Sequence, residues 1–240
     1  MMLKYNNINQ FIFDVDGTLV DSSLSIDNEF GKFLRNFFIN NKCYIVTGAS
    51  YTTTLRQLGS EICNAAEYMI NCGGSHIHKK GREIFASQWT LSQSKKRYLE
   101  NFLRSSQFPY KTGNHFDDRV GMCNFSILGR NTSFKQRKDY VAWDLVTNER
   151  AEICKKFNLR FKKEIARVAG ETGIDISHSE ISKAVMLKYL DDVKTAVFFG
   201  DKTEKGGNDY PLAKKLDYVH QIDNWHQSFE LLLEYDQSGP

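Results

Sequence analysis

Short apolar runs alternate with amphipathic helical patterns in the first part of the chain. Phe11-Ile12-Phe13 predicts a buried strand, residues 26–38 carry apolar side chains at three- and four-residue spacing, and Tyr44-Ile45-Val46 predicts the next strand. A helix at 52–58 and a strand at 68–70 continue this pattern. Parallel strands joined by crossover helices produce such a rhythm. It returns near the end of the chain, where we expect further elements at 182–190, 195–199, 209–216, 218–220 and 225–235.

The middle of the chain lacks this rhythm. Helices are predicted near 92–105 and 149–163, and strands near 115–119 and 122–128, with short strands flanking Gly170 and Gly173. Such a mixture is typical of a separate α+β unit. We therefore predict an α/β protein with a doubly wound, Rossmann-like parallel-sheet core formed by residues 1–80 and 178–240. An α+β cap domain, residues 81–177, is inserted into it.

Composition narrows the class of protein. The chain has 240 residues, 41% hydrophobic and 25% charged, which indicates a folded globular protein. Its mean hydropathy is −0.48 and no apolar run approaches the length of a spanning helix. Lys and Arg (32) nearly balance Asp and Glu (29), so neither a nucleic acid nor a membrane is expected as partner. The first ten residues do not resemble a secretory signal, and a cytoplasmic location is expected.

Five cysteines, an odd number without a C-x-x-C pair, indicate neither a disulfide framework nor a zinc site. Buried reduced thiols are the expectation.

The segment Asp14-Val15-Asp16-Gly17-Thr18-Leu19 directly follows the first predicted strand. Asp201 and the pair Thr47-Gly48 also follow predicted strands. Open parallel sheets bind ligands beyond the carboxyl ends of their strands. We therefore expect these segments to meet at one edge of the sheet.

Two carboxylates in a partly dehydrated crevice repel each other unless a cation joins them or one is protonated. Mg²⁺ prefers oxygen ligands, so Asp14 and Asp201 carboxylates with the backbone carbonyl of Asp16 would suit it. Asp14 could then attack phosphorus and form an aspartyl-phosphate. Asp16 would be free to protonate the leaving oxygen and to deprotonate the incoming one.

Thr47 offers a hydroxyl, and Lys183 a positive charge, to the transferring phosphoryl oxygens. Taken singly, Thr47 could equally end a strand and Lys183 could be solvated. The run Gly200-Asp201-Lys202-Thr203, followed by Gly206-Gly207-Asn208-Asp209, adds a second acid and a glycine-rich turn before a helix. The set as a whole favours phosphoryl-transfer chemistry.

These four segments resemble the motifs of the haloacid dehalogenase (HAD) superfamily of phosphotransferases. The resemblance implies that Asp14 is the nucleophile and Asp16 the general acid and base. It also implies that Asp14 and Asp201 bind Mg²⁺, with Asp209 as a second acidic support for the metal.

The predicted cap contains Arg119-Val120-Gly121-Met122-Cys123-Asn124, then Gly129-Arg130, then Arg137. Guanidinium groups bind phosphate bidentately, although isolated arginines are more often solvated. The pattern resembles the C2-type cap of α-phosphomannomutases. That resemblance implies that Arg119, Arg130 and Arg137 bind the distal phosphate of a hexose phosphate. It further implies a sugar contact from Asp175, a substrate contact at Gly48, and a homodimer through the cap.

The leading hypothesis is therefore a phosphomannomutase that interconverts mannose 6-phosphate and mannose 1-phosphate through a hexose 1,6-bisphosphate, with glucose phosphates as a further substrate class. In that family an arginine usually follows the first motif, whereas this chain has Val20-Asp21-Ser22-Ser23. A magnesium-dependent sugar-phosphate phosphatase is accordingly the alternative. A third hypothesis is a protein that binds sugar phosphates without catalysis. It is disfavoured because the charged residues that catalysis needs are all present: Asp14, Asp16, Lys183 and Asp201.

Overall fold

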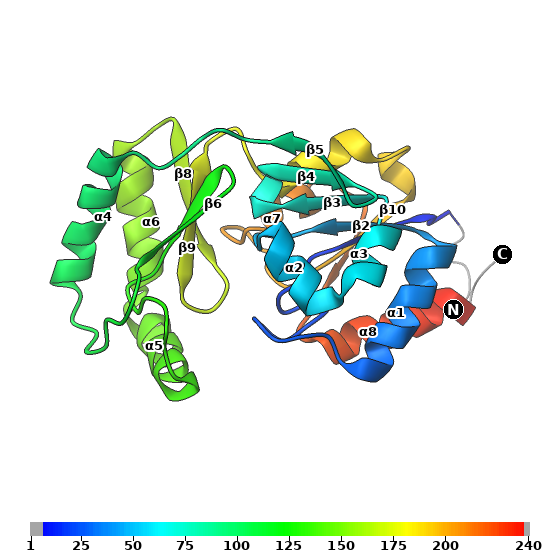
Figure 1. Cartoon of the computed structure of the whole chain (residues 1–240), viewed down its shortest axis with the longest axis horizontal. Coiled ribbons are helices and arrows are strands. Elements are labelled where there is room, and N and C mark those ends of the chain that lie inside the picture. Colours follow the sequence, from blue (N-terminus) through cyan, green and yellow to red (C-terminus); the bar gives the residue numbers. More distant parts are fainter. Residues whose placement is uncertain (1–6, 238–240) are drawn as a thin grey trace. The chain divides into compact units, whose positions relative to one another are not determined.

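The structure is a computed structural model that describes residues 7–237. Its contacts divide the chain into two compact units (Figure 1). The core unit comprises the chain up to Ala86 and the chain from Ser182 onward, and the inserted unit is continuous from Ser87 to Ile181.

A seven-stranded sheet in the order β11-β10-β1-β2-β3-β4-β5 forms the centre of the core unit. The strands from β11 to β3 are parallel, and β4 and β5 add an antiparallel hairpin at one edge. The predicted α/β class with a parallel sheet is thereby confirmed. The strands are β1 (Gln10–Phe13), β2 (Lys42–Val46), β3 (Tyr68–Asn71), β4 (His76–Lys79), β5 (Arg82–Ala86), β10 (Ala196–Gly200) and β11 (Tyr218–Gln221).

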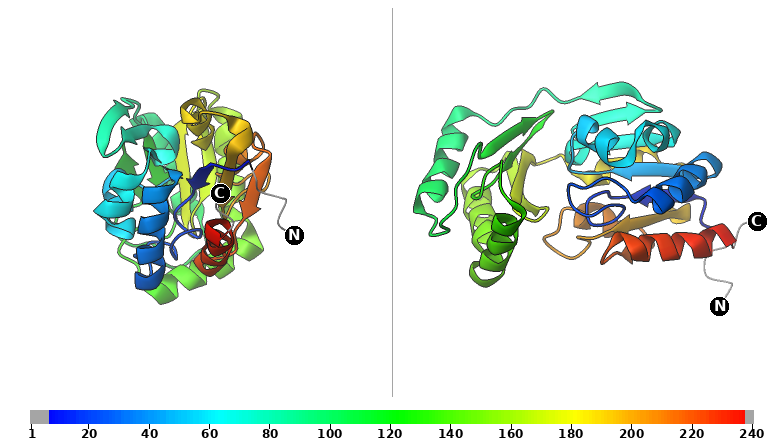
Figure 2. Two further views of the ribbon diagram at one scale, coloured as in Figure 1. Left: turned by 90° about the vertical axis from the view of Figure 1, so that its right-hand side faces the viewer. Right: turned by 60° about the horizontal axis from the view of Figure 1, so that its bottom comes forward.

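Alternation along the strands gives this sheet two apolar faces. Phe11 and Phe13 of β1 pack in one cluster with α1, α3 and α8, while Ile12 lies in a second cluster with Met186 and Leu212. Figure 2 shows α1 in blue and α8 in red within the core unit. The helices of this unit are α1 (Asn28–Asn40), α2 (Tyr51–Leu58), α3 (Ser60–Ala65), α7 (Tyr210–Ala213) and α8 (Trp225–Gln237), with 3₁₀ turns η1 (Cys72–Gly74), η2 (Lys183–Tyr189) and η3 (Val193–Thr195).

The inserted unit has a four-stranded antiparallel sheet in the order β6-β7-β9-β8. Phe125, Ile174 and Ile176 lie on one face of this sheet and pack with Leu99 and Phe157 of the helices. The opposite face carries polar side chains. The elements are α4 (Gln93–Ser105), β6 (Phe116–Arg119), β7 (Met122–Phe125), α5 (Phe134–Thr147), α6 (Glu149–Arg160), β8 (Glu164–Ala169) and β9 (Gly173–His178).

Several elements differ from the sequence expectation. Helix α5 was not expected, and the α-helix expected at 182–190 is the 3₁₀ helix η2. The helix expected at 209–216 ends at Ala213, and the chain continues to Leu216 in tighter turns. No strand was expected at residues 82–86, where β5 pairs with β4 of the core sheet. No helix among residues 7–237 is long and apolar enough to cross a membrane.

Candidate active site

Asp14 stands at the carboxyl end of β1 and is buried. Its backbone N–H donates to the carbonyl of Phe199 at 2.9 Å, which extends the pairing of β1 with β10 by one residue. Gly17 then turns the chain with φ +82°, a conformation that favours glycine. A Cβ atom at Gly17 would lie 2.7 Å from Oδ2 of Asp201, so the turn also gives that carboxylate its space.

Asp16 is held by two donors outside the first motif. Its Oδ1 accepts hydrogen bonds from the backbone N–H of Ser23 at 2.9 Å and from Nε2 of Gln57 at 2.8 Å. Ser23 adopts φ +69° in the segment that follows the motif. Helix α2 and this segment therefore fix the carboxyl group of Asp16.

Three acids from both ends of the chain meet beyond the sheet. Asp14, Asp201 and Asp209 each offer a carboxylate oxygen within 4.8 Å of the other two. Asp201 follows β10, and Asp209 precedes α7 and is fully buried. Oδ2 of Asp209 accepts a hydrogen bond from the backbone N–H of Lys202 at 3.1 Å. The side chain of Asp16 does not belong to this cluster.

Lys183, the first residue of η2, neutralises part of this charge. Its Nζ lies 2.7 Å from Oδ1 of Asp14 and 2.6 Å from Oδ1 of Asp209, and its side chain is 2% exposed. Asp201 forms an ion pair with its neighbour Lys202. One buried ammonium group thus joins Asp14 of the first motif to Asp209, which precedes α7.

Burial dominates the electrostatics of the cluster. It raises the pKa of Asp14 well above the usual range against the effect of Lys183, and the charges of Asp209 and Asp201 raise it further. Burial also raises the pKa of Asp201, against the ion pair with Lys202. For Lys183, burial alone would lower the pKa, but the carboxylates of Asp14 and Asp209 outweigh it and the pKa is raised. The carboxylates are thus held where ionisation is costly without a further cation.

Thr47 and Gly48 follow β2 at the same end of the sheet. Thr47 is buried, and its Oγ1 accepts a hydrogen bond from the backbone N–H of Ala49 at 3.1 Å. Its backbone carbonyl accepts from the N–H of Gly73 at 2.9 Å. The turn after β3 therefore supports the loop that carries Thr47.

In the inserted unit, the structure brings Arg119 and Arg130 to one carboxylate. Oδ2 of Asp117 lies 2.7 Å from Nη2 of Arg119 and 2.8 Å from Nη2 of Arg130. Nη2 of Arg130 also donates to Oδ1 of Asn124 at 3.0 Å, and Nδ2 of Asn124 donates to Oδ1 of Asp175 at 2.7 Å. A continuous polar network thus connects the two arginines to Asp175.

This network follows the register of the sheet. Asp117 pairs with Asn124, Asn124 with Asp175, and Asp175 with Arg167, so four strands contribute one row of polar positions. We call these four residues the polar row. Burial lowers the pKa of Arg167, and Asp175 opposes this effect. The row lies on the face opposite Phe125 and Ile176.

Arg137 lies on α5 and pairs with Glu171, with Nη2 2.8 Å from Oε2. The pKa of Arg130 is lowered by burial; Asp117 opposes this effect, while the charges of Arg119 and Arg137 reinforce it. Arg119 and Arg137 therefore lie close enough to Arg130 for their positive charges to lower its pKa.

Sequence reasoning did not single out Gln57, Asp117, Asn124 or Arg167 as site residues. Gln57 supports Asp16, and the others build the polar row. Their roles depend on cross-strand register and helix placement. Asn124 lies within the arginine-containing motif, which is the one sequence signal that pointed to any of them.

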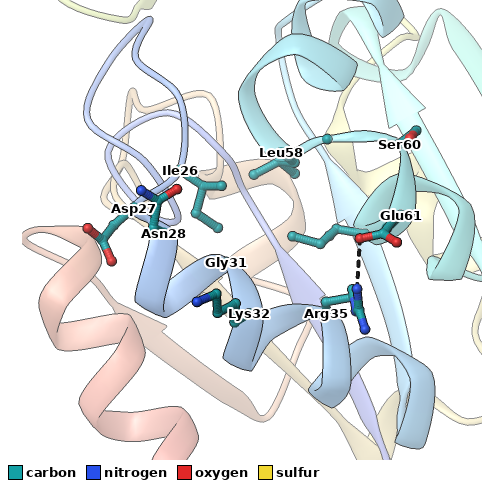
Figure 3. Close-up of a pocket in the computed structure, with 11 residues that line it drawn as sticks. Ile26, Asp27, Asn28, Gly31, Lys32, Arg35, Leu58, Ser60 and Glu61 are labelled. Atoms are coloured by element: carbon teal, nitrogen blue, oxygen red, sulfur yellow. Dashed lines mark hydrogen bonds and ion pairs between the residues drawn. The ribbon is translucent and has the colours of Figure 1, made fainter.

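A separate cavity of about 430 Å³ lies in the core unit between α1 and α3 (Figure 3). Its lining includes Ile26, Lys32, Leu58 and the ion pair of Arg35 with Glu61, whose Nη1 and Oε2 atoms lie 2.9 Å apart. None of the expected site residues lines this cavity.

Comparison with known proteins shows the family to which this chain belongs. The family model described as eukaryotic phosphomannomutase matches residues 30–225. A phosphomannomutase of Arabidopsis thaliana is 32% identical over 214 residues, which cover 84% of this chain and 85% of that protein. A phosphomannomutase of Saccharomyces cerevisiae is 29% identical over 240 residues, covering 93% and 92% of the two chains.

Solved structures support the fold. An IMP-bound IMP-nucleotidase of Plasmodium falciparum matches with a TM-score of 0.64 at 12% identity, covering 98% of this chain and 70% of that chain. A phosphatase of the haloalkanoate (HAD) enzyme superfamily from Bacteroides thetaiotaomicron matches with a TM-score of 0.58 at 16% identity, covering 95% of both chains. At this level of identity the match concerns architecture alone. With the family match over most of its length, the chain belongs to the eukaryotic phosphomannomutase family, on a HAD-type fold.

Proposed function

We propose that this protein interconverts mannose 6-phosphate and mannose 1-phosphate through an aspartyl-phosphate and a hexose 1,6-bisphosphate. One observation carries the proposal. Asp14 from the first core segment and Asp201 and Asp209 from the second converge around the buried ammonium group of Lys183 at the carboxyl edge of the sheet. The family match supplies the substrate class.

The acidic cluster fits a magnesium ion. Its donors are carboxylate oxygens, the ligands that Mg²⁺ prefers, and burial makes their ionisation costly without a cation. We propose Asp14, Asp201 and the backbone carbonyl of Asp16 as ligands. Both oxygens of Asp209 already accept hydrogen bonds, from Lys183 and Lys202, so Asp209 supports the site through these residues. A bound Mg²⁺ would neutralise carboxylate charge and polarise the phosphoryl group.

Asp14 is the proposed nucleophile. Its carboxylate oxygen attacks phosphorus, the bond from phosphorus to the sugar oxygen breaks, and that oxygen receives a proton from Asp16. Both donors to Asp16 bind Oδ1, which leaves Oδ2 to carry the proton. In the second half-reaction Asp16 takes a proton from the incoming sugar hydroxyl, and Asp14 returns the phosphoryl group.

Thr47 and Lys183 are the proposed contacts of the transferring phosphoryl oxygens. Because Oγ1 of Thr47 accepts its hydrogen bond from Ala49, the hydroxyl proton can be donated to phosphate. Gly48 would allow the backbone to approach the substrate. Lys183 is fixed by two carboxylates, so its charge needs little reorganisation during the reaction.

Arg119, Arg130 and Arg137 are the proposed ligands of the distal phosphate, and Asp175 a contact of sugar hydroxyls. The shared bond to Asp117 holds the first two guanidinium groups close together despite their like charge. Such preorganisation lowers the cost of binding an anion.

The test is incubation of the purified protein with mannose 1-phosphate, Mg²⁺ and a hexose 1,6-bisphosphate activator. Formation of mannose 6-phosphate is expected, and Asp14→Asn should abolish it while the circular dichroism spectrum stays unchanged. Binding of mannose 1-phosphate without turnover under any of these conditions would contradict the proposal.

A sugar-phosphate phosphatase is the second candidate, favoured by one observation. The segment where the family usually carries an arginine is Val20-Asp21-Ser22-Ser23, which offers no guanidinium group to the substrate. In this alternative, water hydrolyses the aspartyl-phosphate and releases inorganic phosphate. Release of inorganic phosphate without mannose 6-phosphate would select the phosphatase.

We also propose a homodimer through the inserted unit. Phe134, Leu145 and Val146 of α5 are 73%, 77% and 84% exposed, an unusual concentration of apolar surface on one helix. Sedimentation equilibrium should give twice the chain mass, and Leu145→Glu with Val146→Glu should shift the protein to the monomer. A wild-type monomer at micromolar concentration would contradict the proposal.

A further inference from the structure

A second group of metal-binding side chains lies on the β4–β5 hairpin of the core sheet. His76 and His78 are two positions apart on β4 and so project from the same face. Glu83 of β5 pairs directly with His78, at a register shift between Ile77 and His78. One ligand atom of each of the three side chains lies within 4.8 Å of the other two. The hairpin thus gathers two imidazoles and one carboxylate.

Both histidines are buried, and one of their ring nitrogens lacks a hydrogen-bond partner among the described residues. His76 and His78 are 9% and 4% exposed, and Nε2 of His76 lies 2.7 Å from Oε2 of Glu83. Nδ1 of His78 is buried and has no hydrogen-bond partner among the described residues. Buried ring nitrogens are ordinarily bonded, because leaving one without a partner costs free energy.

Neighbouring rings restrict the orientation of both imidazoles. The ring of Tyr51 stacks on His78 with centroids 3.8 Å apart and an angle of 11°, and the rings of His76 and His78 lie 4.4 Å apart. Tyr51 is the first residue of α2, four positions after Thr47. The cluster therefore connects the hairpin to the start of a helix that follows the Thr47 loop.

We propose that His76, His78 and Glu83 bind one transition-metal ion of the zinc class. Two imidazole nitrogens and a carboxylate are typical ligands of Zn²⁺, whereas Mg²⁺ prefers oxygen donors alone. The side chain of Glu83 is 56% exposed, so water completes the coordination from the solvent side.

The three ligand atoms would shift relative to one another to accept the ion. A tetrahedral ion with ligand distances of about 2.0–2.1 Å separates its ligand atoms by about 3.3 Å. Oε2 of Glu83 would move away from its present 2.7 Å from His76, and the other ligand atoms, which lie within 4.8 Å of one another, would take up that separation. A neutral His76 binds the metal through one ring nitrogen and keeps its proton on the other. Bound metal would tie β4 to β5 and stabilise the core unit.

The experiment uses the full chain with Mg²⁺ in excess, so that the aspartate cluster is occupied. Titration with Co²⁺ should produce the visible absorption bands of a tetrahedral complex at one equivalent, and Zn²⁺ should displace Co²⁺ and raise the melting temperature. Glu83→Gln should weaken Zn²⁺ binding by about tenfold or more, and His78→Gln should abolish it.

Glu180→Gln is the matched control, because Glu180 is another exposed carboxylate beside a histidine, 3.9 Å from Nδ1 of His178. This variant should bind Zn²⁺ as the wild type does. Since Glu83 is exposed, Glu83→Gln decides the question even if His78→Gln fails to fold. Zn²⁺ affinity and melting temperature unchanged in Glu83→Gln would overturn the proposal, as would the absence of tetrahedral Co²⁺ bands in the wild type.

Discussion

Nζ of Lys183 lies 2.6 Å from Oδ1 of Asp209, and both side chains are sealed from solvent. The same ammonium group lies 2.7 Å from Oδ1 of Asp14. One cation therefore balances two carboxylates that are largely shielded from water. The cluster retains excess negative charge unless a proton or a metal ion is added.

Replacement of Lys183 should destabilise the metal-free fold strongly. Lys183→Met leaves Asp14 and Asp209 buried without their cation, and we expect the free energy of unfolding to fall by about 3–5 kcal/mol. Urea denaturation in EDTA measures it. Lys42→Met, which breaks an exposed pair with Asp191, should cost far less stability. Equal losses in the two variants would contradict the buried role of Lys183.

Gly17 and Gly59 form a matched pair for testing the metal site. Both have φ +82°, but a Cβ at Gly17 would lie 2.7 Å from Oδ2 of Asp201, whereas nothing lies within 4 Å of one at Gly59. Both alanine variants should lose about 1–3 kcal/mol of stability from backbone strain. Only Gly17→Ala should raise the Mg²⁺ concentration needed for half-maximal activity, by about tenfold or more. The same Mg²⁺ requirement in both variants would show that Asp201 is not displaced.

Asp117 should matter for substrate binding although it has the wrong charge to bind phosphate. Asp117→Asn removes the carboxylate that Arg119 and Arg130 share, and the two guanidinium groups should separate. We expect KM for mannose 1-phosphate to rise about tenfold, equivalent to ~1.4 kcal/mol, with kcat nearly unchanged. Asp118→Asn, whose exposed carboxylate pairs with Lys96, is the control and should leave KM unchanged. A fall in kcat alone would argue against a binding role.

His220 should contribute to acid sensitivity of the core unit. Burial lowers its pKa, against the attraction of Glu234, so the unfolded chain takes up a proton more readily than the folded one. The free energy of unfolding should therefore fall as pH drops below about 6.5, until the folded pKa is passed. His220→Gln should make this pH dependence shallower between pH 7 and 5 in urea titrations. It should not remove it, because burial lowers the pKa of His78 in the same direction. An unchanged slope would contradict the assignment.

The sequence revealed the parallel core because its strands are short apolar runs that end in chemically informative residues. Asp14 and Asp201 each follow such a run, so their convergence could be expected before the structure was known. Helix α5 lacked a comparable signal: Tyr140 is its one fully buried side chain, and its start is marked by the capping box of Ser133 and Gln136. The helical pattern around Met186 was visible, but not its tight 3₁₀ winding.

The polar row could not be predicted in the same way. Asp117 and Asp118 are adjacent and chemically identical, yet one binds two arginines and the other Lys96. Which of them faces the arginines depends on strand register, and a shift of one residue would exchange their roles. Lys183 posed a similar problem, because a lysine at the start of a helix is ordinarily solvated and only the packing shows that this one is buried.

The strand order of the core has a consequence for synthesis on the ribosome. β1 pairs with β10, which is translated more than 180 residues later, so this pairing cannot form until then. The inserted unit draws its four strands from one uninterrupted stretch and can complete its own sheet first. Nascent chains would therefore carry a finished insertion on an unfinished core, with Asp14 unable to meet Asp209 until the second core segment has been translated.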